Sequence, residues 1–229
     1  MHALSATELL SVWEHGSNQS PLQRALTMLA VACPEASLES LARLTIGQRD
    51  ARLLALRETM FGAELTGITD CPECGEKVEL SFNCSDIHPQ PEIEAPAELA
   101  VQSNGREVRF RLPTSADLLA VNSSEQLLER CLLDGGCPLT TDFLPTIVAK
   151  MSSADPLADI HLALNCPSCA HKWEAVFDIV AFLWREITAA ARRLLREIHT
   201  LASAYGWTES EILSLSPARR RVYLEMATE

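Results

Sequence analysis

The predicted fold depends on two short stretches, Cys71-Pro72-Glu73-Cys74 and Cys166-Pro167-Ser168-Cys169. The residues that follow them also agree, because Lys, Glu and Phe recur after both turns at a constant offset of 95 positions. Two cysteines three positions apart around a tight turn can direct both sulfurs at one ion, and two such turns supply the four thiolates that closed structural zinc sites prefer. We therefore expect Cys71, Cys74, Cys166 and Cys169 to bind one structural zinc ion.

The spacing between the two cysteine pairs is unusual for a zinc ribbon. Paired turns of this kind are commonly separated by about 15 to 20 residues, whereas Cys74 and Cys166 are much farther apart. We interpret the pattern as a zinc ribbon with a long insertion. The alternatives are ordinary buried thiols and a redox dithiol, and the latter is disfavoured because a redox Cys-x-x-Cys motif opens a helix, whereas strand-like runs follow both pairs here.

The other potential ligands show no comparable pattern. His171 lies two positions after Cys169 and could replace a ligand, although a solvent-facing histidine is the favoured interpretation. The remaining cysteines are expected to be small core or partly exposed thiols; they are Cys33, Cys84, Cys131 and Cys137.

The composition limits the class of protein. The chain has 229 residues and a formal net charge of −12, which disfavours binding to nucleic acid. No stretch approaches the roughly 20 consecutive apolar residues of a membrane-spanning helix, and the first residues lack the pattern of a secretory signal. We therefore expect a cytoplasmic protein whose cysteines do not form a disulfide framework.

The first part of the sequence, residues 1–64, is predicted to be helical. Ser5-Ala6-Thr7-Glu8 forms a capping box, Ser20-Pro21 is typical of a helix start, and Ser37 is expected to cap a third helix. Residues 48–61 form an amphipathic pattern that ends at Gly62.

The central part is predicted to be a split zinc ribbon, residues 65–87 and 160–178, with strands over 77–82 and 172–177. The insertion, residues 88–159, begins within an acidic, proline-rich linker over 86–96. Runs over 99–102 and 106–112 flank Ser103-Asn104-Gly105, which predicts a β-hairpin, and we expect it to be an exposed arm. Helical patterns follow over 118–121, 125–133 and 142–151, the first capped by Thr114 or Ser115.

The last part, residues 179–229, is predicted to contain a long helix over 179–204 and a helical hairpin. Gly206 ends the helix, Thr208-Glu209-Ser210-Glu211 is a second capping box, and Ser216-Pro217 starts a last helix. The predicted fold class is therefore α+β and mainly α, with N-terminal and C-terminal helices around a small zinc-ribbon β unit that carries an α+β insertion with a β-hairpin.

The sequence gives no sign of catalysis. It contains no His-Glu-x-x-His, no phosphate-binding glycine-rich loop and no Gly-x-Ser-x-Gly, so we expect a protein that is not an enzyme. Two arginine clusters, Arg192, Arg193 and Arg196 with Arg219–Arg221, are interpreted as solvated helix faces paired with Glu186, Glu197 and Glu225. A face for docking a partner is the alternative.

Several stretches together resemble the baseplate hub assembly chaperone family of contractile-tailed phages and of bacterial contractile injection systems. Besides the two cysteine turns with Trp173-Glu174, they are Leu44–Asp50 with Leu53–Glu58, Arg111–Leu118, Ala154–Asp159 and Tyr205–Leu213. The resemblance implies a non-enzymatic role in building the hub or baseplate of a contractile tail in a bacterial cell. It also implies binding to other baseplate or hub proteins. It supplies no catalytic residues.

Three functions therefore remain open from the sequence. The first is an assembly chaperone or component of a contractile baseplate, and the second is a zinc-ribbon adaptor that binds nucleic acid or the transcription machinery. The third is a zinc hydrolase. The sequence leaves the oligomeric state open, and also whether the protein stays in the assembled tail particle.

Overall fold

Four helices form the N-terminal part of the computed structural model, which describes residues 1–87, 96–103, 106–133 and 144–227. They are α1 (Ala6–Gly16), α2 (Pro21–Ala32), α3 (Leu38–Ala42) and α4 (Ile46–Phe61). Ser5, Ser20 and Ser37 cap the first three as the sequence predicts, and each side-chain oxygen accepts a hydrogen bond from a backbone amide of the first turn. Gly62 ends α4 with φ 93°, a conformation that an L side chain rarely adopts. These predictions of helix ends are confirmed.

Two antiparallel hairpins carry the cysteine turns at their tips. The first pairs β1 (Glu64–Asp70) with β2 (Lys77–Asn83), and the second pairs β5 (Ile160–Asn165) with β6 (Lys172–Phe177). Asp70 faces Lys77 in the first hairpin, and Asn165 faces Lys172 in the second, so the strand registers repeat the offset of 95 positions. The strands after the turns were predicted, whereas β1 and β5 were not.

The insertion between the hairpins has a small core of its own. Its elements are α5 (Cys84–Ile87), β3 (Leu99–Ser103), β4 (Arg106–Phe110), α6 (Ser115–Ala120), α7 (Ser124–Cys131), α8 (Leu144–Ala154) and the 3₁₀ turn η1 (Pro156–Ala158). The predicted hairpin strands are present, and its tip at 104–105 lies outside the described residues. The expectation of an exposed arm was wrong, because Val101, Val108 and Phe110 are buried together with Ile147 of α8. Most of the predicted linker, residues 88–95, also lies outside the described residues.

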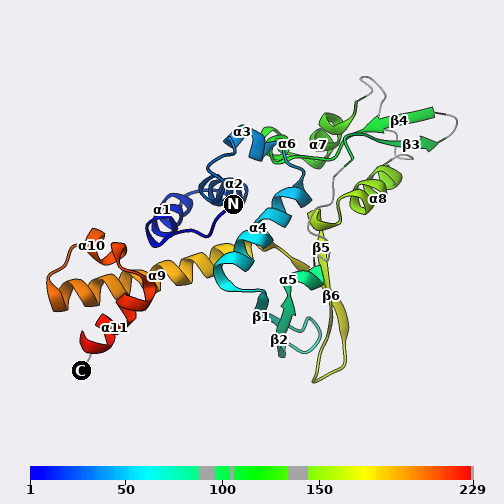
Figure 1. Cartoon of the computed structure of the whole chain (residues 1–229). Helices are drawn as coiled ribbons and strands as arrows, with labels where there is room; N and C mark the ends of the chain where they lie inside the picture. The colour runs from blue at the N-terminus through cyan, green and yellow to red at the C-terminus, as the bar shows by residue number, and fades with distance from the viewer. Residues whose placement is uncertain (88–95, 104–105, 134–143, 228–229) are drawn as a thin grey trace.

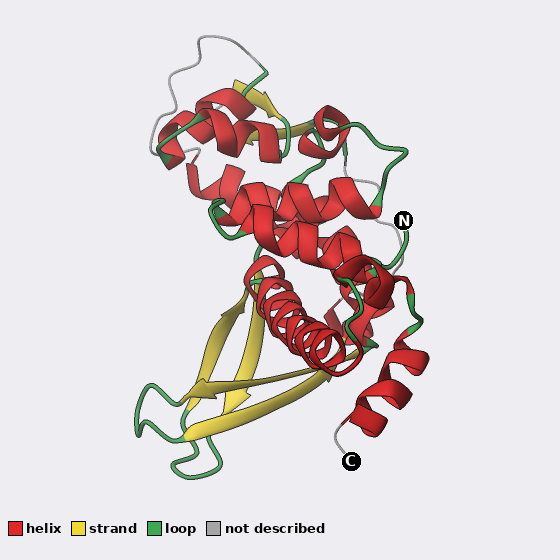
Figure 2. Cartoon of the chain, turned by 90° about the vertical axis from the view of Figure 1, so that its left-hand side faces the viewer, coloured by secondary structure: helices red, strands yellow, loops and turns green. Residues whose placement is uncertain are grey.

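The C-terminal part is dominated by α9 (Ile179–Tyr205), followed by α10 (Glu209–Ser214) and α11 (Pro217–Ala227). Gly206 ends α9 in the left-handed conformation, as expected from the sequence. Leu183, Ile187 and Leu201 of α9 are fully buried in the same core as α1, α2 and α4. Figure 2 shows α9 almost end-on, with the two hairpins on one side and α11 on the other. The fold is therefore α+β and mainly helical (Figure 1).

Helix α4 connects the insertion to the helical core. At its first turn, the amide of Gly47 donates a hydrogen bond of 3.0 Å to Oδ2 of Asp155, which precedes η1. At its last turn, Arg57 donates to both carboxylate oxygens of Glu186 on α9, at 2.8 and 2.9 Å, and to the carbonyl of Gly62. Side chains from distant parts of the sequence therefore hold both ends of α4.

Membrane-spanning helices are also excluded for the described part of the chain. None of its helices combines the length and the apolar character that a bilayer crossing requires.

The Arg57–Glu186 pair should stabilise the fold measurably. Replacing Arg57 by Met leaves the partly buried Glu186 carboxylate without its partner, so we expect the free energy of unfolding in urea to fall by about 2 to 4 kcal/mol. The matched control is Arg43→Met, which removes an exposed pair with Glu39. That change should cost less than about 0.5 kcal/mol. Equal losses in the two variants would contradict the assignment.

Candidate metal centre

Both cysteine turns are built from the same backbone hydrogen bonds. In the first, the amide of Cys71 donates to the carbonyl of Glu76 at 2.8 Å, and the amide of Gly75 donates to the carbonyl of Cys71 at 2.9 Å. In the second, the equivalent bonds join Cys166 to His171 at 2.9 Å and Ala170 to Cys166 at 3.0 Å. The hairpin strands hold each turn at its ends, so local hydrogen bonds position the two sulfurs within each turn.

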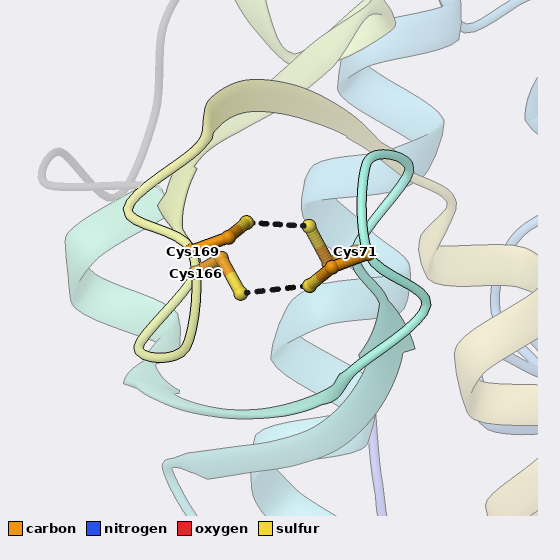
Figure 3. A group of neighbouring side chains, drawn as sticks. Cys71, Cys166 and Cys169 are labelled. Atoms are coloured by element: carbon orange, nitrogen blue, oxygen red, sulfur yellow. Dashed lines mark hydrogen bonds between the residues drawn. The ribbon is translucent and has the colours of Figure 1, made fainter.

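The two tips meet so that the four predicted sulfurs converge. The Sγ atoms of Cys71 and Cys169 are 3.7 Å apart, and those of Cys74 and Cys166 are 3.6 Å apart. All four lie within 4.8 Å of one another. Figure 3 shows the side chains pointing from the two turns toward a common centre. Cys71 and Cys166 are only 2% and 1% exposed, whereas Cys74 and Cys169 reach the surface.

The contacts between the two hairpins are symmetric, because replacing each residue by its equivalent 95 positions away gives the same contacts. Adding the offset of 95 turns Cys71 into Cys166 and Cys74 into Cys169, so the contact between Cys71 and Cys169 maps onto the contact between Cys166 and Cys74. The equivalent aromatic residues Phe82 and Phe177 also contact each other, with ring centroids 5.5 Å apart and an interplanar angle of 86°. The hairpins therefore pack as two copies of one unit, joined by sulfurs at the tips and by aromatic rings near the base.

The crowded sulfurs resist full ionisation. The pKa of the Cys166 thiol is lowered to about 7, chiefly because the backbone amide of Cys169 donates a hydrogen bond to its sulfur. At Cys74 the amide of Glu76 favours the thiolate, but the hydrogen bond with Cys169, burial and the contacts with the other sulfurs outweigh it and raise the pKa to about 12. A second negative charge next to the first is unfavourable unless a cation neutralises it.

The donor set fits a zinc ion. Four thiolates about 2.3 Å from one Zn²⁺ in a tetrahedron lie about 3.8 Å apart, close to the two shortest sulfur distances here. Four protein ligands would fill the shell and leave no position for a reactive water, which is the arrangement of structural rather than catalytic zinc. The chemistry available to these residues is therefore to bind a soft cation and to hold the two hairpins together.

The other candidate ligands lie outside this group. The ring of His171 stacks on Trp173, with centroids 6.1 Å apart, and His171 is not one of the four clustered ligands. Cys33, Cys84 and Cys131 are buried thiols elsewhere, as expected for core residues, and Cys137 lies outside the described residues.

A cavity of about 310 Å³ lies beside α4. Apolar side chains such as Leu22, Leu157 and Phe177 line it together with Arg49 and Asp50. Burial raises the pKa of Asp50, but Arg49 donates to both of its oxygens, at 2.7 and 3.0 Å. A carboxylate held in a bidentate ion pair is a poor general base, so the cavity does not suggest a catalytic site.

One feature of the site was missed in the sequence. Gly75 and the equivalent Ala170 both have positive φ, 72° and 58°, and Ala170 is the one non-glycine residue with positive φ among those described. The fifth position of each turn therefore requires the left-handed conformation. Aligning the two turns one residue past each second cysteine pairs Gly75 with Ala170. The glycine at this position could have revealed the left-handed conformation.

Comparison with models of protein families gives a match. The model of a family described as T4 bacteriophage base plate protein matches residues 4–133, which is more than half of the chain. The match includes the N-terminal helices, the first hairpin with Cys71 and Cys74, and the insertion as far as α7 and Leu133. Searches of curated proteins and of solved structures found no significant match.

The cysteines can be tested by substitution. Cys71→Ser and Cys166→Ser should each release the metal, because a three-thiolate shell binds zinc less tightly, and should lower the melting temperature, since metal binding contributes to folding. Metal content by elemental mass spectrometry and thermal melting are the measurements. Cys33→Ser, at a buried thiol outside the cluster, should keep the metal. Full metal content and unchanged melting in Cys71→Ser would rule out the shared site.

The left-handed positions give a matched pair of variants. Ala170→Gly should raise the free energy of unfolding of the metal-loaded protein by about 0.5 to 1 kcal/mol, because it removes steric strain that exceeds the entropic cost of glycine. Gly75→Ala should lower it by a similar amount. Chemical denaturation of both variants tests this, and changes of the same sign would contradict the equivalence of the two turns.

Proposed function

Because this chain belongs to the T4 bacteriophage base plate protein family, we propose that it helps to build the baseplate hub of a contractile tail. It acts as an assembly chaperone or as a component of the hub, in a phage or in a phage-like contractile injection system. It works through contacts with other tail proteins and catalyses no reaction. The family match is the observation that carries this proposal, and it agrees with the resemblance noted in the sequence.

The metal centre supports a scaffolding role. We infer that β1–β2 and β5–β6 form a split zinc ribbon, in which Cys71, Cys74, Cys166 and Cys169 bind one structural zinc. The ion would replace the mutual repulsion of thiolates by four metal–sulfur bonds and fix the angle between the hairpins. Since both hairpins extend away from the helical core (Figure 1), their outer faces are available to a partner.

The experiment is co-expression with the candidate hub and baseplate proteins encoded near this chain, followed by affinity purification and mass spectrometry. We expect stoichiometric recovery of at least one tail protein. The Cys166→Ser variant should recover less of it if the zinc-held hairpins form the contact surface, and Cys33→Ser should match the unaltered chain. Failure to associate with any hub or wedge protein would refute the proposed function.

The composition of the finished particle distinguishes an assembly chaperone from a component of the hub. A component should be present in purified tails at a fixed ratio to the other baseplate proteins, whereas a chaperone should be found on assembly intermediates and absent from finished tails. Quantitative mass spectrometry of both fractions gives the answer. Salt-sensitive binding of DNA or RNA without any tail partner would instead favour the zinc-ribbon adaptor.

A further inference from the structure

Helix α9 presents a face of arginines that form no ion pair within the described residues, although Cζ of Arg185 lies 5.6 Å from the ring centroid of Phe182. The basic stripe consists of Arg185, Arg192, Arg193 and Arg196, whose side chains are all exposed. At 100° per residue these positions fall on one side of the helix, opposite the buried Leu183, Ile187 and Leu194. An exposed helix face with four positive charges is unusual in a chain whose net charge is −12.

The carboxylates on α9 do not neutralise the basic stripe. Glu186 accepts both of its hydrogen bonds from Arg57 of α4, and Glu197 pairs with Arg220 of α11 at 3.4 Å. These are the two acidic residues of the helix. The expected pairing is therefore confirmed for Arg220 with Glu197 and wrong for Arg192, Arg193 and Arg196. The basic stripe has no carboxylate partner in the described part of the chain.

The first hairpin presents the opposite charge. Its acidic face consists of five exposed carboxylates on the outer side and tip of the hairpin, Glu64, Asp70, Glu73, Glu76 and Glu79, and one exposed cation, Lys77, lies opposite Asp70 on the same side. Within the described residues none of them forms an ion pair. Ile68 lies among them on the outer side and is 64% exposed, which is high for a large apolar side chain. At the equivalent positions the second hairpin keeps two of the five carboxylates, as Asp159 and Glu174, and has Asn165, Ser168 and His171 in place of the other three, so its outer side is less acidic.

The two surfaces have similar lengths, and each has an exposed apolar side chain beside its charged side chains. Arg185 to Arg196 spans about 17 Å along a helix, and Glu64 to Asp70 spans about 20 Å along a strand. Leu195, 36% exposed, lies beside Arg196 as Ile68 lies beside the carboxylates. Arginine is suited to such a contact because its planar guanidinium binds carboxylates with two hydrogen bonds. An apolar centre within a charged rim is the usual anatomy of a protein interface.

We propose that the chain associates with a second copy of itself, with the basic stripe of one copy docked on the acidic face of the other. No ion pair joins these two surfaces within the residues that the structure describes, and a second copy would bring them together. Nucleic acid fits less well, since the carboxylates on the hairpin that extends from the same end of α9 would repel a polyanion. This inference does not depend on the proposed role in a baseplate.

A charge swap tests the inference. The stripe variant carries Arg192→Glu, Arg193→Glu and Arg196→Glu, and the hairpin variant carries Glu73→Lys, Glu76→Lys and Glu79→Lys. The unaltered metal-loaded chain should self-associate in analytical ultracentrifugation, and raising the salt from about 0.05 M to about 0.5 M should weaken the association. Each variant alone should self-associate at least about tenfold more weakly, because like charges then face each other. An equimolar mixture should recover the association, since opposite charges again face each other.

The controls separate the interface from loss of structure. The control variant carries Arg52→Glu, Arg219→Glu and Arg221→Glu, at exposed sites outside both surfaces. Its net charge changes by the same amount as that of the stripe variant, and it should self-associate like the unaltered chain. Far-UV circular dichroism and metal content should be unchanged in every variant. An unaltered chain that stays monomeric at about 100 μM would overturn the proposal. So would a mixture that fails to associate, or loss of association in the control. Binding of a DNA duplex through the basic stripe, without self-association, would replace the second copy by nucleic acid.

Discussion

The contact between the two hairpins is the constraint on which the rest of the structure depends. Four sulfurs meet at the tips and Phe82 meets Phe177 near the base, so two segments 95 positions apart are held as one unit. The entropic cost of closing a loop grows only slowly with its length, and one strong attachment can therefore hold the ends of a long insertion. Zinc binding, as proposed, would supply that attachment because its binding energy becomes folding energy.

Helix α4 is the second element that organises the chain. Its first turn binds the Asp155 carboxylate through the amide of Gly47, and its last turn binds Glu186 of α9 through Arg57. A side chain at position 47 would collide with Asp155, which explains why glycine is needed there. The insertion and the C-terminal helix are thus oriented by opposite ends of one helix, and the second hairpin leads directly from one to the other.

These attachments leave a distinctive set of surfaces. The four clustered cysteines can hold a metal ion, and Asp50 in the neighbouring cavity is held by Arg49. The acidic face of the first hairpin and the exposed side of α9 carry opposite charges. A protein whose charged faces are unpaired within the chain is suited to assembly with other molecules, which agrees with membership of a baseplate family.

The sequence by itself determined the features that depend on neighbouring residues. Helix starts at Ser5, Ser20 and Thr208 were predictable because a cap is a bond between a side chain and an amide three positions away. The four cysteines were predictable because their turns repeat. Strands β1 and β5 were missed, since Gly67 and polar residues interrupt β1, and β5 contains the polar residues His161 and Asn165. What makes them strands is pairing with β2 and β6.

Only the tertiary structure decided which side chains pair over long distances. The sequence suggested that Glu186 and Glu197 pair with the two arginine clusters. Arg220 of the second cluster does pair with Glu197, but Glu186 pairs with Arg57, 129 positions away on another helix. The sulfur contacts join the first cysteine of each turn to the second cysteine of the other. Such pairings follow from how whole elements pack, and a local pattern contains no information about that packing.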